Sequence, residues 1–184
     1  METLVNAKDL VLFWVQPRAT RRNFILRSGE RIFCNLDFRS GFDSLAEAIS
    51  ANGTWTFKQV GCFSPHVTVR WAGSNIDLVT CHTSWIGTER EIKFSSGEIY
   101  LWKVANFWAT SYTVSSGNGV ELVTYRSGSD EKNITNLFKH QAQVHISLDA
   151  WQLAELNLIV LLGWYLVLLQ QEDSAAVAVT GALG

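Results

Sequence analysis

The residues best suited to chemistry are arginines near the N-terminus: Arg18, Arg21, Arg22 and Arg27. Guanidinium groups donate paired hydrogen bonds to phosphate oxygens, and a surface cation near an anionic leaflet contributes about 1 kcal/mol. The group therefore predicts a cradle for a phosphorylated lipid head group. If residues 22–27 form a strand, however, Arg22 lies on the opposite face from Arg21 and Arg27. The alternative interpretation is a solvated loop and strand whose arginines prevent edge pairing.

Cysteine and histidine offer one grouping that resembles a zinc site: Cys62, His66, Cys81 and His82. Zinc requires four converging ligands, whereas adjacent residues of a strand, such as Cys81 and His82, face opposite sides. We therefore predict a buried cysteine, a surface histidine and no metal. The three cysteines show no tight spacing, so no disulfide framework is indicated.

Motifs typical of enzymes are missing from the sequence: it has no G-x-S-x-G, no G-x-x-x-x-G-K and no H-E-x-x-H. We therefore predict a protein that is not an enzyme and uses no cofactor. The net charge of −2 gives no general attraction to nucleic acid. The apolar run at residues 10–15 is short and follows Asp9, which does not fit a secretory signal, so we expect a cytoplasmic protein.

The elements that must position these residues are mostly strands. Gly and Asn pairs such as Ser28-Gly29, Asn52-Gly53 and Gly117-Asn118-Gly119 mark tight turns. The segments between the turns are rich in Val, Ile, Thr and aromatic residues, and many alternate between apolar and polar side chains. They predict about twelve strands: 10–15, 22–27, 31–38, 54–60, 66–71, 76–82, 90–94, 98–103, 107–114, 120–125, 135–140 and 142–148. Residues 43–50 predict a short helix, since Ala and Glu favour that state.

A C-terminal helix is predicted from about residue 150 to 171, followed by a mobile tail at 172–184. Asp149 and Gln152 have the spacing of a capping box. The sequence from Leu158 to Leu169 is apolar on every side, so it must be buried in protein or in lipid. We expect its core to consist of Leu158, Ile159, Leu161, Leu162, Gly163, Trp164, Leu166 and Leu169.

Length and flanking residues favour burial in protein. The uninterrupted run would span about 18 Å, compared with about 30 Å of hydrocarbon in a bilayer. No Lys or Arg lies beside it, and Trp164 and Tyr165 lie inside it instead of at its ends. A barrel of eleven or twelve strands has room for a helix. We therefore predict a closed antiparallel β-barrel around the helix, over residues 1–171; a membrane anchor and an oligomer interface are the alternatives.

The arrangement resembles the superfamily that joins the tubby C-terminal domain, the phospholipid scramblases and the LURP-one-related proteins. The resemblance rests on "VHISLDAWQLAELNLIVLLGWYLVLL" at the C-terminus and on the segment "FSSGEIYLWKVANFWATSYTV" at residues 94–114. It implies a twelve-stranded barrel around a hydrophobic helix. It also implies a membrane-associated module that binds phospholipids or phosphoinositides.

Two departures from that superfamily stand out. Scramblases carry an acidic calcium-binding segment before the final helix, but here Asp149 is the only carboxylate in that region. The paired basic residues of tubby proteins cannot be matched position by position. Two other roles remain open. One is a tail-anchored membrane protein, and the other is a protein-interaction scaffold that uses the barrel loops around Trp71 and Trp85. Trp71, Trp85 and Trp108 lie beside loops and are the candidates for exposed aromatic residues, but a position in the core is favoured for all three.

Overall fold

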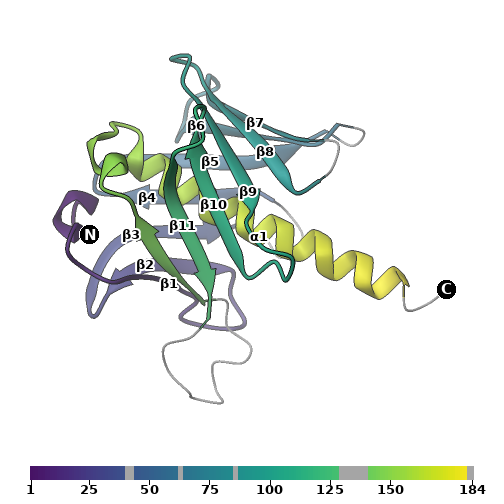
Figure 1. The fold of residues 1–184 in the computed structure, drawn as a ribbon, viewed down its shortest axis with the longest axis horizontal. Coiled ribbons are helices and arrows are strands. Elements are labelled where there is room, and N and C mark those ends of the chain that lie inside the picture. The colour runs from purple at the N-terminus through teal and green to yellow at the C-terminus, as the bar shows by residue number, and fades with distance from the viewer. Residues whose placement is uncertain (40–43, 62–63, 85–86, 129–140, 182–184) are drawn as a thin grey trace.

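The computed structural model describes residues 1–39, 44–61, 64–84, 87–128 and 141–181, with only the helical backbone given for 177–181. Within these ranges twelve strands form one closed antiparallel barrel (Figure 1). Each strand pairs with its neighbours in the chain, and β1 pairs with β12 to close the barrel. The predicted fold class is therefore confirmed. The strands are β1 (Leu12–Val15), β2 (Asn23–Ser28), β3 (Arg31–Phe38), β4 (Ala46–Ser50), β5 (Gly53–Val60), β6 (His66–Trp71), β7 (Asp77–Thr83), β8 (Glu89–Phe94), β9 (Ile99–Val104), β10 (Ser111–Ser116), β11 (Glu121–Ser127) and β12 (Gln141–Ile146).

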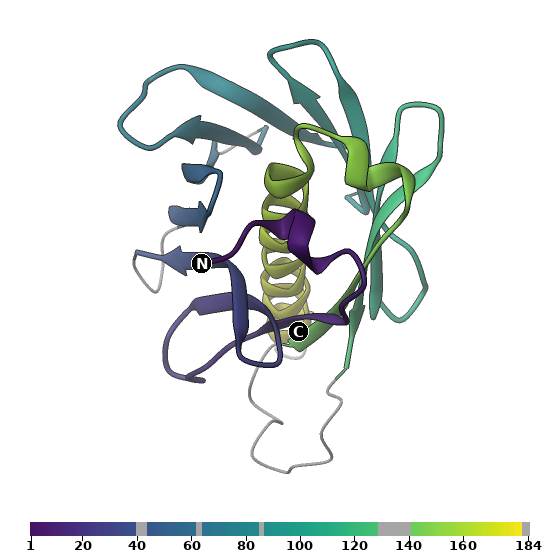
Figure 2. The ribbon, with the colours of Figure 1, turned by 90° about the vertical axis from the view of Figure 1, so that its left-hand side faces the viewer.

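The helix α1 (Leu156–Gly181) runs through the barrel, and Figure 2 shows the strands surrounding it. Every residue from Leu158 to Leu169 is buried. All the residues predicted to form the helix core are therefore in the lumen, and it is the barrel that covers the apolar run in this structure. Aromatic side chains on the inner face complete the packing; the Trp14 ring, for example, stacks on Trp164 with centroids 5.8 Å apart.

Hydrogen bonds to backbone carbonyls fix α1 inside the barrel. The Trp102 indole N–H donates to the Gly163 carbonyl over 3.2 Å, and the Tyr125 hydroxyl donates to the Val160 carbonyl over 3.0 Å. A Cβ atom at Gly163 would lie 2.3 Å from the Tyr125 hydroxyl oxygen. The glycine in the middle of the helix is therefore needed for the close approach of the Tyr125 ring.

Residues 46–50 are a strand, so the predicted helix at 43–50 is wrong. β4 pairs with β3 and β5, and Ala46 and Ala48 point inward, beside Phe57 and Trp55 of β5. The two small side chains leave room for the large neighbouring rings and for the helix. Tertiary pairing thus outweighs the helical propensity of Ala and Glu.

The helix boundaries also differ from the prediction. Asp149–Gln152 is a 3₁₀ turn without a side-chain cap, and Leu153 is extended before α1 begins at Leu156. The chain must first cross the barrel end from β12 to the axis, which explains the delayed start. α1 continues to Gly181, so much of the predicted tail is helical. The predicted strand at 135–140 lies outside the described residues.

Candidate functional site

The barrel has two ends, because α1 enters at one and leaves at the other. We call the second end the exit mouth. In an antiparallel barrel with this order, the last residues of β1, β3, β5, β7 and β9 all lie at this end. The polar turn of α1 at residues 170–174 lies there, and the rest of the helix projects beyond the strands (Figure 1). The opposite end is the entry mouth.

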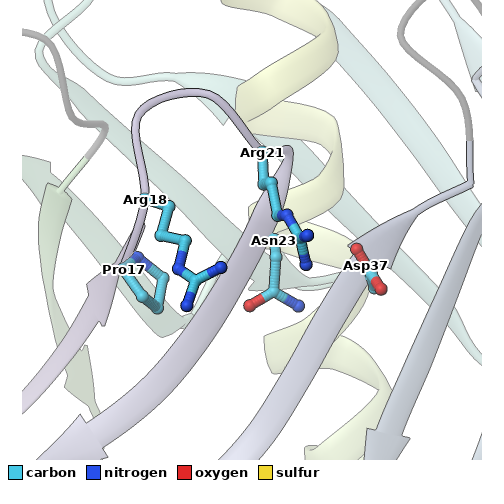
Figure 3. Close-up of a pocket in the computed structure, with 5 residues that line it drawn as sticks. All are labelled: Pro17, Arg18, Arg21, Asn23 and Asp37. Atoms are coloured by element: carbon cyan, nitrogen blue, oxygen red, sulfur yellow. The ribbon is translucent and has the colours of Figure 1, made fainter.

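Arg18 and Arg21 lie together in the β1–β2 connection at the exit mouth. They line a pocket of about 310 Å³ with Pro17, Asn23 and Asp37, and Figure 3 shows both side chains extending from the loop toward Asn23. Among the described residues, neither guanidinium has a carboxylate within ion-pair distance. The Asp37 carboxylate lines the same pocket and lowers its positive charge.

The β1–β2 loop that carries these arginines is held by its own hydrogen bonds. The buried Gln16 amide donates to the Arg21 carbonyl over 2.8 Å, and the Arg21 N–H donates to the Arg18 carbonyl over 3.1 Å. This geometry presents two guanidinium groups outward on a fixed loop, which suits a phosphate group.

The other predicted arginines do not join this pocket. Arg22 turns inward, pairs with Glu172 of α1 and lies 3.8 Å above the Phe38 ring. Arg27 is exposed on the barrel wall opposite Phe13 of β1, farther toward the entry mouth. The structure thus assembles Arg18 and Arg21, but it places Arg22 inside the exit mouth and Arg27 apart.

Phe107 and Trp108 form an exposed aromatic pair in the β9–β10 connection of the exit mouth. Their side chains are 92% and 78% exposed. The sequence placed both residues in a strand at 107–114, but β10 begins only at Ser111. Trp108 had been singled out as an exposed aromatic, whereas Phe107 had not. Aromatic rings of this kind are enriched where proteins contact the interface of a membrane.

The turn that carries this pair is well defined. The Asn106 carboxamide oxygen accepts hydrogen bonds from the backbone N–H groups of Thr110 and Ser111, at 2.9 and 3.1 Å. The Tyr112 hydroxyl donates to the Ala109 carbonyl over 2.7 Å. Ala109 adopts a φ of 49°, a left-handed conformation that costs a residue with a Cβ about 1–2 kcal/mol. The loop therefore displays two apolar rings to solvent while it keeps a strained backbone.

The entry mouth has a different character. A pocket of about 430 Å³ lies there between Trp55, Trp71, Phe94 and Leu158. Trp71 is 44% exposed and its ring stacks on Trp55, with centroids 5.0 Å apart. Trp71 is thus an exposed aromatic residue, which the sequence analysis had given only as the alternative to a position in the core. Trp85 lies outside the described residues.

The predicted orientation of Cys81 and His82 is confirmed. Cys81 is fully buried, and His82 is exposed on the outer wall, where its ring stacks on His66. Burial raises the pKa of the Cys81 thiol to about 12, which keeps it protonated. Within the described ranges, no three metal-ligating side chains are grouped for metal binding; Cys62 lies outside them.

None of the described helices combines the length and the apolar character needed to cross a bilayer. Comparisons with family models, with curated proteins and with solved structures found no match. The resemblance to the tubby and scramblase superfamily therefore stays a prediction, with which the barrel around a helix is compatible.

Proposed function

We propose that the protein is a non-enzymatic module that docks on membranes containing anionic phospholipids or phosphoinositides, and that it docks through the exit mouth. One observation carries the proposal. The exit mouth combines the exposed Phe107–Trp108 pair with the fixed arginines Arg18 and Arg21. Aromatic rings favour the interfacial region of a bilayer, and the arginines favour its phosphate groups.

The free energy of transfer from water to a membrane surface supports this arrangement. The Phe107 and Trp108 rings contact each other but bury little surface against the barrel, and a turn with a strained backbone holds them in water. Each ring would gain free energy by leaving water, and each arginine near an anionic leaflet would add about 1 kcal/mol. Together these contributions suit reversible attachment to a surface.

Retention on vesicles tests the proposal. The full chain is incubated with vesicles of phosphatidylcholine, alone or with phosphatidylserine or a phosphoinositide, and pelleted. The wild-type protein is expected to pellet with the anionic vesicles. Arg18→Ala/Arg21→Ala should weaken retention by about 30-fold, which corresponds to about 2 kcal/mol. Phe107→Ser/Trp108→Ser should also weaken it.

Matched variants control for charge and hydrophobicity. Arg27→Ala/Lys93→Ala removes two positive charges from the outer wall, and Ile76→Ser/Ile99→Ser removes two exposed apolar side chains near the entry mouth. Both controls should retain wild-type binding. Equal retention of the exit-mouth variants and the controls, or no retention of the wild-type protein, would refute the proposal.

A second candidate is a protein-interaction scaffold, and the observation that favours it is the exposed Trp71 beside the aromatic pocket of the entry mouth. It predicts a protein partner that is lost in Trp71→Ser but kept in Phe107→Ser/Trp108→Ser. Partner capture compared between these two variants separates the candidates.

A further inference from the structure

A buried arginine with unused hydrogen-bond donors lies inside the exit mouth. Arg90 of β8 is 2% exposed, and its Nε and Nη1 atoms have no hydrogen-bond partner among the residues that the structure describes. Its Nη2 atom is 3.6 Å from a carboxylate oxygen of Asp173 on α1, which is longer than a hydrogen bond. A buried charge is costly unless it is paired and hydrogen-bonded, so the arginine lacks partners that it needs.

Arg90 also lines a pocket. The pocket has a volume of about 450 Å³, within the range of about 300–1,000 Å³ that is typical of small-molecule sites. Its polar lining comes from three inward-facing strand residues, Gln59, Thr83 and Arg90, and from one turn of α1, residues 170–174. Gln59 and Thr83 offer neutral donors beside the guanidinium.

Within the described ranges, Asp173 is the one acidic residue that pairs with Arg90. Glu172, the other carboxylate of this turn, pairs with Arg22 on another side of the mouth. Asp173 has a 60% exposed side chain, so it can move aside at little cost. On its inner side, Arg90 faces the ring of Trp102 at 5.8 Å. An anion that enters the pocket would supply the acceptors that this guanidinium lacks.

We propose that this pocket binds a phosphate group, with Arg90 as its charged donor and Gln59 and Thr83 as neutral donors. A planar guanidinium suits phosphate oxygens, and a phosphate has enough acceptors for several donors at once. The group can belong to a lipid head group at the docked membrane or to a phosphate compound in solution. The site goes beyond the proposed membrane docking and does not depend on it, because free phosphate can reach the open pocket.

Calorimetry on the full chain without lipid tests the site, with inorganic phosphate and glycerol 3-phosphate as probes at constant ionic strength. The wild-type protein is expected to bind at least one of them. Arg90→Gln should weaken binding by about tenfold or more, since it removes a charge-assisted hydrogen bond. Arg27→Ala, which removes an exposed arginine of the outer wall, should leave binding unchanged.

Asp173→Asn keeps the test valid if Arg90→Gln does not fold. The substitution removes the competing carboxylate from an exposed position, so phosphate binding should tighten several-fold. If the Arg90–Asp173 pair were only structural, the variant would lower the melting temperature and leave phosphate affinity unchanged. Two results together would overturn the site. The wild-type protein would bind no phosphate probe, and a folded Arg90→Gln variant would be retained on vesicles as well as the wild-type protein.

The two sources of phosphate are separated by vesicles that contain phosphatidic acid. If Arg90→Gln lowers retention on them, the group is a lipid head group. If it lowers only the binding of soluble probes, the ligand is a free phosphate compound. Failure of the Phe107→Ser/Trp108→Ser test would reject membrane docking and leave the phosphate site standing.

Discussion

Close contacts between single residues explain how the barrel accommodates its helix. The Tyr125 ring occupies the space that a side chain at residue 163 would need. Its hydroxyl donates to the Ile159 and Val160 carbonyls, one turn earlier in the helix. The Trp102 indole binds the Gly163 carbonyl from another side. One glycine thus allows two large rings to contact the helix backbone.

Gly163→Ala is expected to destabilise the protein by about 1–3 kcal/mol because the new methyl group overpacks against Tyr125. Helix propensity alone predicts the opposite, since Ala is favoured over Gly by about 1 kcal/mol. Denaturant unfolding measures the net effect. In a Tyr125→Leu background the same substitution should cost less, and a stabilising effect of Gly163→Ala in the wild-type protein would contradict the packing argument.

Arginines inside the exit mouth account for the polar turn that ends the apolar run. Arg22, just before β2, and Arg90 of β8 point inward, and Glu172 and Asp173 of α1 face them. The alternation of β8 shows how Arg90 could have been found from sequence, since it is in phase with the buried Ile92 and Phe94. Charged residues are rarely buried, so alternation alone did not single out Arg90.

At the level of elements, the strands and α1 depend on one another. An eight-stranded barrel fills its lumen with its own side chains, but a twelve-stranded one needs an additional object. The inner rings of Trp14, Phe24, Phe38 and Phe57 contact Trp164 or Tyr165 of the helix. Neither part has a complete core alone.

A chain that ends at Leu148 is therefore expected to aggregate, because removal of α1 exposes the apolar lumen. A chain that ends at Ser174 keeps the buried part of α1 and both carboxylates of its polar turn, and it should stay folded. Size exclusion without detergent and circular dichroism distinguish the outcomes. A compact, monodisperse chain of residues 1–148 would show that the helix is not part of the core.

For the whole molecule, burial makes the fold sensitive to alkali. It raises the pKa of Tyr100, Tyr112, Tyr125 and Tyr165, and it raises the pKa of the Cys34 and Cys81 thiols to about 12. As pH rises, the unfolded chain then releases these protons before the folded protein does. The resulting stabilisation is complete below about pH 8.5, the pKa of a free thiol, and is lost progressively above it.

The melting temperature is accordingly expected to fall as the pH is raised from about 9 to 11. Absorbance of tyrosinate at alkaline pH should appear together with the loss of structure and disappear on return to neutral pH. Titration of the tyrosines near pH 10 in a protein that keeps its near-ultraviolet circular dichroism would contradict the prediction.

The sequence by itself determined the barrel and the central helix. The alternation of apolar and polar residues in segments such as 141–146 shows which side chains face the barrel lumen and which face solvent. A helix that is apolar on every side has to be enclosed. It also singled out Arg18 and Arg21, since two guanidinium groups beside a turn are visible in the chain.

Only the tertiary structure decided the rest. β4 is a strand because it pairs with β3 and β5, and this pairing does not depend on the local helix propensity of its residues. The 3₁₀ turn at Asp149–Gln152 exists because the chain must reach the barrel axis. The meeting of the Arg18–Arg21 loop, the Phe107–Trp108 turn and Arg90 at one mouth follows from barrel closure. Closure joins segments far apart in the chain through long-range pairing, which no local pattern encodes.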